Sequence, residues 1–252
     1  MKIFDSHTHL NDEEFEKDLK EVIDRSILNK IEKMIVVGFD VPSSYNALKL
    51  AREFNGLIFA SCGIHPHDAD KFEEGIKEIE ELAKEKEIVA IGETGLDYYK
   101  NYSSKEKQIE SFIAHIEIAR KYQKPIIIHT RKSFGDAFNI LKNCKDIKGV
   151  FHCFSGGKEE VIYAQKIGFY ISFSGSITYN SKKLEESLKN TSLERLIVET
   201  DAPYLTPLPL KGRCEPSYII YTIKKISEIL NIEEKEIAEK TYKNAQTLFD
   251  LT

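Results

Sequence analysis

Residues 125–174 read PIIIHTRKSFGDAFNILKNCKDIKGVFHCFSGGKEEVIYAQKIGFYISFS, in which three short apolar runs alternate with two amphipathic stretches. The apolar runs are rich in Ile, Val and Phe, have the length of buried parallel strands, and span 125–130, 149–154 and 169–174. The stretches between them carry apolar residues at helical spacing. This alternation predicts strand–helix units whose strands lie parallel to one another.

The same alternation continues over the whole chain and predicts eight strands. They span residues 3–9, 33–38, 57–63, 88–93, 125–130, 149–154, 169–174 and 195–200. Helices are predicted at 12–29, 43–54, 72–87, 103–122, 134–144, 158–167, 181–190, 215–230 and 233–249. Eight such units in 252 residues are typical of an α/β fold of the TIM (β/α)8 barrel type. The additional C-terminal helix is expected to clasp the outside of the barrel.

We predict a single domain over residues 1–252, because no linker or change of composition interrupts this pattern. The turns after the strands contain neither GxGxxG nor GxxxxGK[ST], which disfavours a doubly wound sheet and a nucleotide cofactor. The first ten residues do not read as a secretory signal, and the four cysteines form no CxxC pair. The apolar runs are also too short to span a membrane. We therefore expect a cytoplasmic monomer that contacts no membrane.

The charge balance limits how the protein could bind nucleic acid. The chain has 36 Lys and Arg against 41 Asp and Glu, and its formal net charge is −5. This excludes a protein that grips duplex phosphate through a diffuse basic surface. A nucleic-acid substrate held by metal ions remains compatible with the charge.

Side chains that can bind metal ions lie at the ends of five predicted strands. Because these ends meet at one mouth of a barrel, we expect the side chains to converge there. They are His7, His9, Glu93, His129, His152 and Asp201. Each alone has an ordinary structural explanation, such as a core histidine or a turn-capping aspartate, but together they predict a metal site. Six imidazole and carboxylate ligands suffice for two divalent ions (Mg, Mn, Zn, Co or Ni), with Glu93 as the bridge.

Seven motifs resemble the TatD family of metal-dependent deoxyribonucleases, in order and across nearly the whole chain. They are FDSHTHL (4–10), GIHPH (63–67), IGETGLDYY (91–99), PIIIHTR (125–131), FHCFSG (151–156), ETDAPYL (199–205) and NAQTLF (244–249). The resemblance implies an amidohydrolase-like TIM barrel and a DNA substrate, cut from a single-stranded 3′ end. It also implies two ion sites that share Glu93, one with His7, His9 and Asp201 and the other with His129 and His152.

One motif departs from the family pattern. TatD-like chains commonly carry Arg-Asn-x-Pro before the eighth helix, whereas this chain reads Arg213-Cys214-Glu215-Pro216. Because the arginine is retained, we expect Arg213 to contact the substrate phosphate. A contact that depends on the asparagine is in doubt.

Two further residues near the predicted mouth are candidates for binding substrate. His65 ends the third strand and is expected to touch the substrate phosphate or the attacking water, with a structural role in its loop as the alternative. Arg131 follows His129 by two residues and is expected to clamp phosphate, since a guanidinium matches phosphate oxygens.

Several other polar residues near the strand ends have two interpretations each. Asp97 orients either a ligand or a loop, and Glu199 either holds a further ion or outer-shell water or has no such role. Aromatic rings at the mouth either stack unpaired bases or pack onto the barrel rim, and they belong to Tyr98, Tyr99, Tyr102 and Tyr204. His67 is expected to be structural, and His115 to be either solvated or part of the core.

The leading hypothesis is hydrolysis of DNA phosphodiester bonds by a 3′-5′ exonuclease that activates water with two metal ions. Asp201 would accept the proton of the attacking water, and Glu93 and His65 would complete the catalytic set. One alternative is a hydrolase of the same superfamily that acts on an ester or amide, such as D-aminoacyl-tRNA. The other is a non-catalytic nucleic-acid-binding barrel that keeps its metal ligands for stability.

Overall fold

The computed structural model describes residues 1–251 and alternates strands with helices from end to end. Its strands are β1 (Ile3–Thr8), β2 (Ile31–Val37), β3 (Ile58–Cys62), β4 (Ile88–Asp97), β5 (Ile126–Arg131), β6 (Gly149–Phe151), β7 (Tyr170–Phe173) and β8 (Leu196–Val198). Its α-helices are α1 (Leu19–Leu28), α2 (Val41–Glu53), α3 (Phe72–Leu82), α4 (Lys105–Tyr122), α5 (Phe134–Leu141), α6 (Lys158–Lys166), α7 (Lys182–Asn190), α8 (Ile219–Leu230) and α9 (Glu234–Phe249). Within residues 1–251, none of these helices combines the length and the apolar character needed to cross a membrane.

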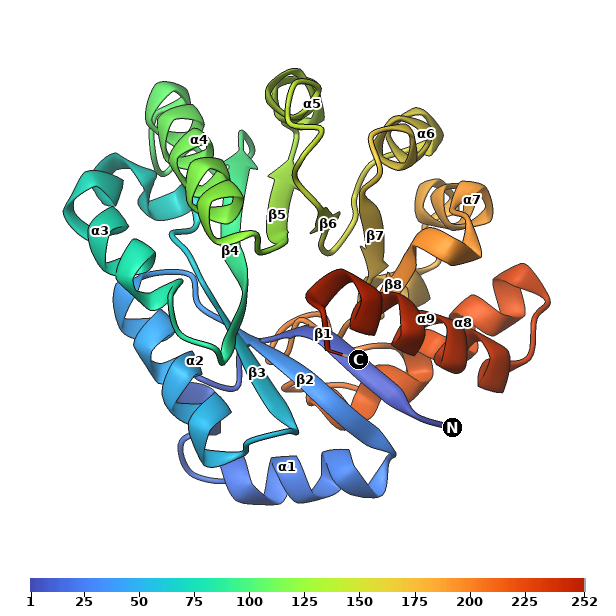
Figure 1. Cartoon of the computed structure of the whole chain (residues 1–252). Coiled ribbons are helices and arrows are strands. Elements are labelled where there is room, and N and C mark those ends of the chain that lie inside the picture. Colours follow the sequence, from blue (N-terminus) through green and yellow to red (C-terminus); the bar gives the residue numbers. More distant parts are fainter. Residues whose placement is uncertain (252) are drawn as a thin grey trace.

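The eight strands form one parallel sheet whose spatial order is the order of the chain. Figure 1 shows the sheet curled into a ring, with the helices outside it. The ring is completed at the seam between β1 and β8. There the Ser6 hydroxyl donates to the Val198 carbonyl over 3.0 Å, and the Thr200 amide donates to Asp5 Oδ1 over 2.9 Å. The predicted TIM barrel is confirmed.

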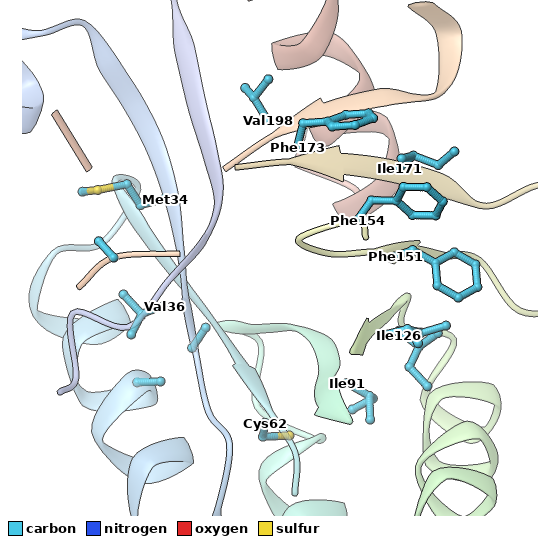
Figure 2. Close-up of a cluster of buried hydrophobic side chains, with 14 of the residues drawn as sticks. Met34, Val36, Cys62, Ile91, Ile126, Phe151, Phe154, Ile171, Phe173 and Val198 are labelled. Atoms are coloured by element: carbon cyan, nitrogen blue, oxygen red, sulfur yellow. The ribbon is translucent and has the colours of Figure 1, made fainter. Parts of the chain in front are cut away.

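The apolar core has two layers, because successive side chains of a strand point to opposite faces. The outer layer lies between the strands and the helices, and Figure 2 shows part of it around Phe151, Phe154 and Phe173. The inner layer fills the barrel and consists mainly of Phe4, Ile35, Val37, Val89, Ile127, Val150, Tyr170 and Ile197. The metal-ligand candidates lie beyond this inner layer, at the C-terminal ends of the strands.

Helix α9 does not clasp the outside of the barrel, and that expectation was wrong. Its side chains Tyr242, Ala245, Leu248 and Phe249 join the inner apolar layer. The Phe249 ring lies 6.0 Å from the ring of Phe4, centroid to centroid. The helix therefore closes the N-terminal end of the barrel with its apolar side chains.

Strand β4 extends four residues beyond the predicted end at Glu93. It continues to pair with β5 from Thr94 to Asp97, after an irregularity in register between Ile91 and Thr94. Gly95 permits this pairing, because its φ is +137° and an added Cβ would lie 2.1 Å from the carbonyl oxygen of His129. The close approach of the two strands places Glu93 beside His129.

Candidate metal centre

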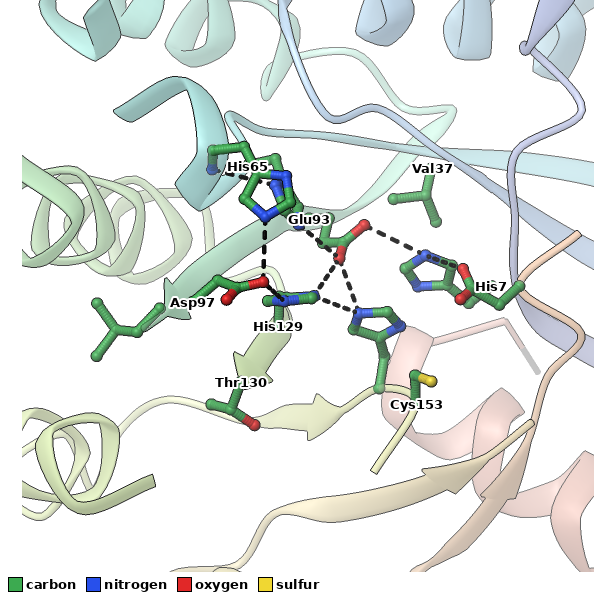
Figure 3. A network of polar contacts seen from close by, with 12 residues as sticks. His7, Val37, His65, Glu93, Asp97, His129, Thr130 and Cys153 are labelled. Carbon is green, nitrogen blue, oxygen red and sulfur yellow. Dashed lines mark hydrogen bonds and ion pairs between the residues drawn. The ribbon is translucent and has the colours of Figure 1, made fainter. Parts of the chain in front are cut away.

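Glu93 lies at the middle of the site, where its two carboxylate oxygens face different sets of imidazoles (Figure 3). Its Oε1 atom lies 2.9 Å from His129 Nδ1 and 2.8 Å from His152 Nε2. Its Oε2 atom lies 3.4 Å from His7 Nε2 and 3.8 Å from His9 Nε2. The side chain is only 5% exposed. One buried carboxylate thus connects the ligand candidates of β1 with those of β5 and β6.

Asp201 completes the group around the two histidines of β1. The Nε2 atoms of His7 and His9 lie 3.2 Å apart, so both rings point to one spot. Asp201 Oδ1 lies 3.5 Å from His7 Nε2 and 3.4 Å from His9 Nε2. The chain holds Asp201 here by a backbone bond of 2.9 Å from its amide to the His7 carbonyl. All six predicted ligands are therefore brought together at the mouth.

Two of the four histidines have a hydrogen-bond partner for the ring nitrogen that faces away from the centre, and a third faces a carboxylate there. His9 Nδ1 lies 3.3 Å from the Val37 carbonyl, and His129 Nε2 lies 3.2 Å from Asp97 Oδ2. His152 Nδ1 lies 3.4 Å from Glu199 Oε1. Such outer partners fix the tautomer and orientation of histidines that bind metal. Asp97 therefore lies where it can orient a ligand, and Glu199 lies beside the outer nitrogen of His152.

Asp97 serves both the ligand and the loop behind it. Its Oδ2 atom lies 3.1 Å from His67 Nε2 as well as near His129, and its Oδ1 atom accepts the amides of Tyr99 and Lys100 at 2.8 and 3.0 Å. Burial favours the neutral acid, but the hydrogen bonds from His129, the two amides and His67 hold the pKa of Asp97 well below its usual range. It is therefore an anion that restrains the ring of His129.

The charges of the centre support one another. Burial would raise the pKa of Glu93, but the nearby imidazoles, chiefly His152 and His65, hold it well below its usual value. Burial would likewise raise the pKa of Asp201, which its hydrogen bond with His9 and the charge of His7 keep low. Burial opposes charge on His152, yet the Glu93 and Glu199 carboxylates raise its pKa. His152 and the two carboxylates therefore stabilise one another's charged forms.

The donor set fits divalent metal ions. Three groups each gather ligand atoms within 4.8 Å of one another, and they consist of His7, His9 and Asp201; His7, Glu93 and His152; and His65, Glu93 and His129. Imidazole and carboxylate are the ligands that zinc and comparable borderline ions take in proteins. In addition, His7 Nδ1 is buried and has no hydrogen-bond partner among the described residues, so its ring is held only by packing and by whatever its Nε2 binds.

The structure places two predicted substrate residues at different depths of the mouth. His65 Nε2 lies 3.4 Å from Glu93 Oε1, and burial lowers the pKa of this imidazole to about 4. Arg131 lies farther out, where its guanidinium stacks 3.9 Å from the centre of the Tyr99 ring. His65 thus belongs to the buried centre, whereas Arg131 is exposed at its edge.

Arg213 is engaged inside the protein. Its guanidinium donates to both oxygens of Asp18, at 2.8 and 2.6 Å, and to Glu215 at 3.2 Å. It also donates to the Glu14 carbonyl and lies over the Phe15 ring at 4.5 Å. The structure therefore gives this arginine a role in fixing the segment after β8 against α1, while its contact with phosphate remains a prediction.

Sequence reasoning missed the residue pair that supports the seam beneath the centre. Asp5 is fully buried and accepts from the Thr200 amide and hydroxyl at 2.9 and 2.5 Å. Burial raises the pKa of this carboxyl to about 8, against the effect of those hydrogen bonds. The pair joins the strand of His7 to the segment of Asp201. A charged residue inside an apolar strand was the signal that could have found it.

Comparison with known proteins agrees with this geometry. The model of the TatD related DNase family matches residues 4–250. The uncharacterized metal-dependent hydrolase YabD of Bacillus subtilis is 42% identical, over 98% of this chain and 98% of its own length. The 3′-5′ ssDNA/RNA exonuclease TatD of Escherichia fergusonii is 32% identical, over 99% of this chain and all of its own length.

A solved structure shows the same architecture. The TatD family hydrolase of Entamoeba histolytica superimposes with a TM-score of 0.92 at 26% identity, over 100% of this chain and 99% of its own. Fold, motifs and family model therefore agree along the entire barrel. The chain belongs to the TatD family and is a metal-dependent hydrolase of that family.

Proposed function

We propose that this protein is a metal-dependent nuclease that shortens single-stranded DNA from its 3′ end, with two divalent ions per chain. One observation carries the proposal: the Glu93 oxygens face separate ligand groups, Oε1 toward His129 and His152 and Oε2 toward His7 and His9. A carboxylate so placed can bridge two ions. The Escherichia fergusonii relative, named a 3′-5′ ssDNA/RNA exonuclease, supports this choice of substrate.

The chain's own residues divide the chemical work. Bound divalent ions would make water acidic and polarise the phosphoryl oxygens. Asp201 would accept the proton of the attacking water, since the imidazoles of His9 and His7 keep its pKa low and its carboxylate ionised. His65, neutral at pH 7, would hydrogen-bond to the water or a phosphate oxygen, and Arg131 would bind a phosphate at the edge.

The decisive experiment uses metal-loaded protein and 5′-labelled single-stranded DNA. We expect stepwise shortening from the 3′ end with Mg²⁺, Mn²⁺ or Zn²⁺. Glu93→Gln should lower the rate by more than about 100-fold and reduce the metal content, because the bridge loses its charge. The matched control is Glu53→Gln at the exposed end of α2, which should leave both unchanged.

Two further arms separate the alternatives. Release of a D-amino acid from D-aminoacyl-tRNA, with intact DNA strands, would favour the ester or amide hydrolase. DNA binding that survives removal of metal, without any hydrolysis, would favour the non-catalytic barrel. Intact single strands with every metal tested would refute the nuclease.

A further inference from the structure

The mouth of the barrel has two sides of opposite charge. On the side of β4 and β5 lies a group of exposed residues that we call the tyrosine–cation rim, consisting of Tyr99, Lys100, Tyr102, Arg131 and Lys132. On the side of β1, the loop after the strand carries Asp12, Glu13 and Glu14. The small net charge of −5 therefore conceals a local separation of charge around the metal centre.

In the tyrosine–cation rim, cations lie over aromatic rings. Arg131 lies 3.9 Å and Lys132 4.9 Å from the centre of the Tyr99 ring, and Lys100 lies 5.7 Å from that of Tyr102. The rings remain open to solvent, with Tyr99 50% and Tyr102 63% exposed. The three cations take part in none of the ion pairs within residues 1–251. Their charge is available to an anionic ligand.

Direct contacts connect this rim to the metal centre. Asp97, which holds the ring of His129, lies opposite Arg131 in the backbone register of β4 and β5. The Tyr98 amide donates to the Arg131 carbonyl over 2.9 Å. The Tyr102 ring packs edge-on against His67 at 4.8 Å, and His67 shares Asp97 with His129. A ligand seated at Glu93 would thus meet the rim next.

The opposite side cannot offer the same contacts to an anion. Glu13 and Glu14 are exposed there, and Arg213, which contacts the Glu14 carbonyl, is already bound by Asp18 and Glu215. The Tyr204 hydroxyl points to Asp12 at 3.4 Å. A phosphate chain that crossed this side would meet like charge, so electrostatics favour a path over β4 and β5.

We propose that the tyrosine–cation rim binds the nucleotides next to the scissile phosphodiester. Tyr102 stacks one unpaired base, and Arg131, steadied on the Tyr99 ring, binds the adjoining phosphate together with Lys132. The inference rests on the proposed nuclease function and extends it by assigning the path of the strand. Because every base has a stacking face, such a subsite binds single strands with little preference for sequence.

The test compares a long substrate with a small one that cannot reach the rim. For a labelled single-stranded oligonucleotide, we expect Tyr102→Leu and Arg131→Gln each to raise KM about 10-fold with little change in kcat. For bis(p-nitrophenyl) phosphate, which has no base to stack, Tyr102→Leu should equal the wild type. Tyr102→Phe should restore the oligonucleotide KM, because it keeps the ring. Tyr45→Leu, which alters a tyrosine 49% exposed on α2, is the matched control and should have no effect.

Binding distinguishes failure of this subsite from failure of the proposed function. Fluorescence anisotropy would measure affinity for an oligonucleotide whose terminal linkages are phosphorothioates, which prevents cleavage. About 10-fold weaker binding by Tyr102→Leu, absent in Tyr102→Phe, would support the rim even if the wild type cleaves no DNA. Equal affinity and equal KM of the wild type and Tyr102→Leu would overturn the rim even if the wild type shortens DNA.

Discussion

Single residues behind the candidate metal ligands decide how those side chains are held. Asp97 restrains His129, and Glu199 lies 3.4 Å from His152 Nδ1 while accepting the Cys153 amide at 2.7 Å. Both carboxylates are buried, so water cannot replace the bonds they make. The orientation of the imidazoles is therefore a property of their neighbours as much as of the strands that carry them.

Replacing Asp97 by asparagine tests whether its carboxylate orients His129 for metal binding. Asp97→Asn keeps the size of the side chain but removes the charge that faces His129 and His67. We expect metal affinity to fall about 10- to 100-fold with the fold intact. Metal titration with circular dichroism as a check measures this, and Asp24→Asn on the exposed face of α1 is the control. Unchanged affinity would show that Asp97 only shapes its loop.

The burial of His115 leads to a separate prediction about the stability of the protein in acid. The residue is buried in α4, where Nε2 accepts the Ile64 amide at 3.0 Å and Nδ1 donates to the Ser111 carbonyl at 2.7 Å. Burial lowers its pKa from 6.5 to about 4, so the unfolded chain takes up a proton in this range that the native protein does not. This proton uptake lowers the free energy of unfolding by up to about 3 kcal/mol as the pH falls from 6.5 to 4.

The measurement is the free energy of unfolding against pH, in EDTA. Between pH 7 and pH 4, the free energy of unfolding of His115→Gln should fall by about 3 kcal/mol less than that of the wild type, because the substitution removes this proton uptake. The histidines of the mouth titrate in both proteins and cancel in the comparison. Parallel pH profiles would refute the assignment.

At the scale of elements, the pairing of β4 with β5 builds the centre, and glycine makes the pairing possible. Gly95→Ala would push a Cβ against the His129 carbonyl at a φ of +137°. We expect a loss of at least about 2 kcal/mol in stability, together with weaker metal binding. Gly135→Ala is the matched control, because its Cβ would meet nothing within 4 Å in α5 and should stabilise by up to about 1 kcal/mol. Thermal unfolding and metal content compare the two.

Periodicity predicted the elements better than it predicted their ends. The eight strands and nine α-helices within residues 1–251 were all foreseen, because apolar runs and helical spacing are local signals. The extension of β4 was missed, since it depends on a close approach to β5 that only the folded chain reveals. The helix predicted from residue 215 begins at Ile219, after a 3-10 turn at Pro216–Tyr218.

The candidate site was predicted in the same uneven way. The candidate ligands could be predicted from the sequence because each follows an apolar run. The contacts of Asp5 and the partners of Arg213 could not be predicted. The Arg213–Asp18 contact joins residues 195 positions apart, and the Asp5–Thr200 contact spans the same distance along the chain. No local pattern records which distant side chains meet. Tertiary packing alone supplies these bonds.

For the whole molecule, the two ends of the barrel have separate tasks: the mouth holds the polar centre, and α9 seals the other end with apolar side chains. Phe249→Ala should lower the free energy of unfolding by about 3–5 kcal/mol, because it opens a cavity beside Phe4. Metal affinity of the folded variant should stay the same. Chemical denaturation measures the loss. The control is Leu28→Ala, at a side chain 76% exposed, which should change the free energy of unfolding little. A joint loss of stability and metal affinity would show that the two ends are coupled.

The seal formed by α9 has a practical consequence for handling the protein. β1 starts and α9 ends on the sealed side, and Figure 1 shows both termini near each other there. A tag, a fused domain or a covalent linker at either terminus would therefore sit a full strand length away from the mouth. The protein could be anchored to a bead or sensor by its C-terminus with its reactive face turned toward the solution.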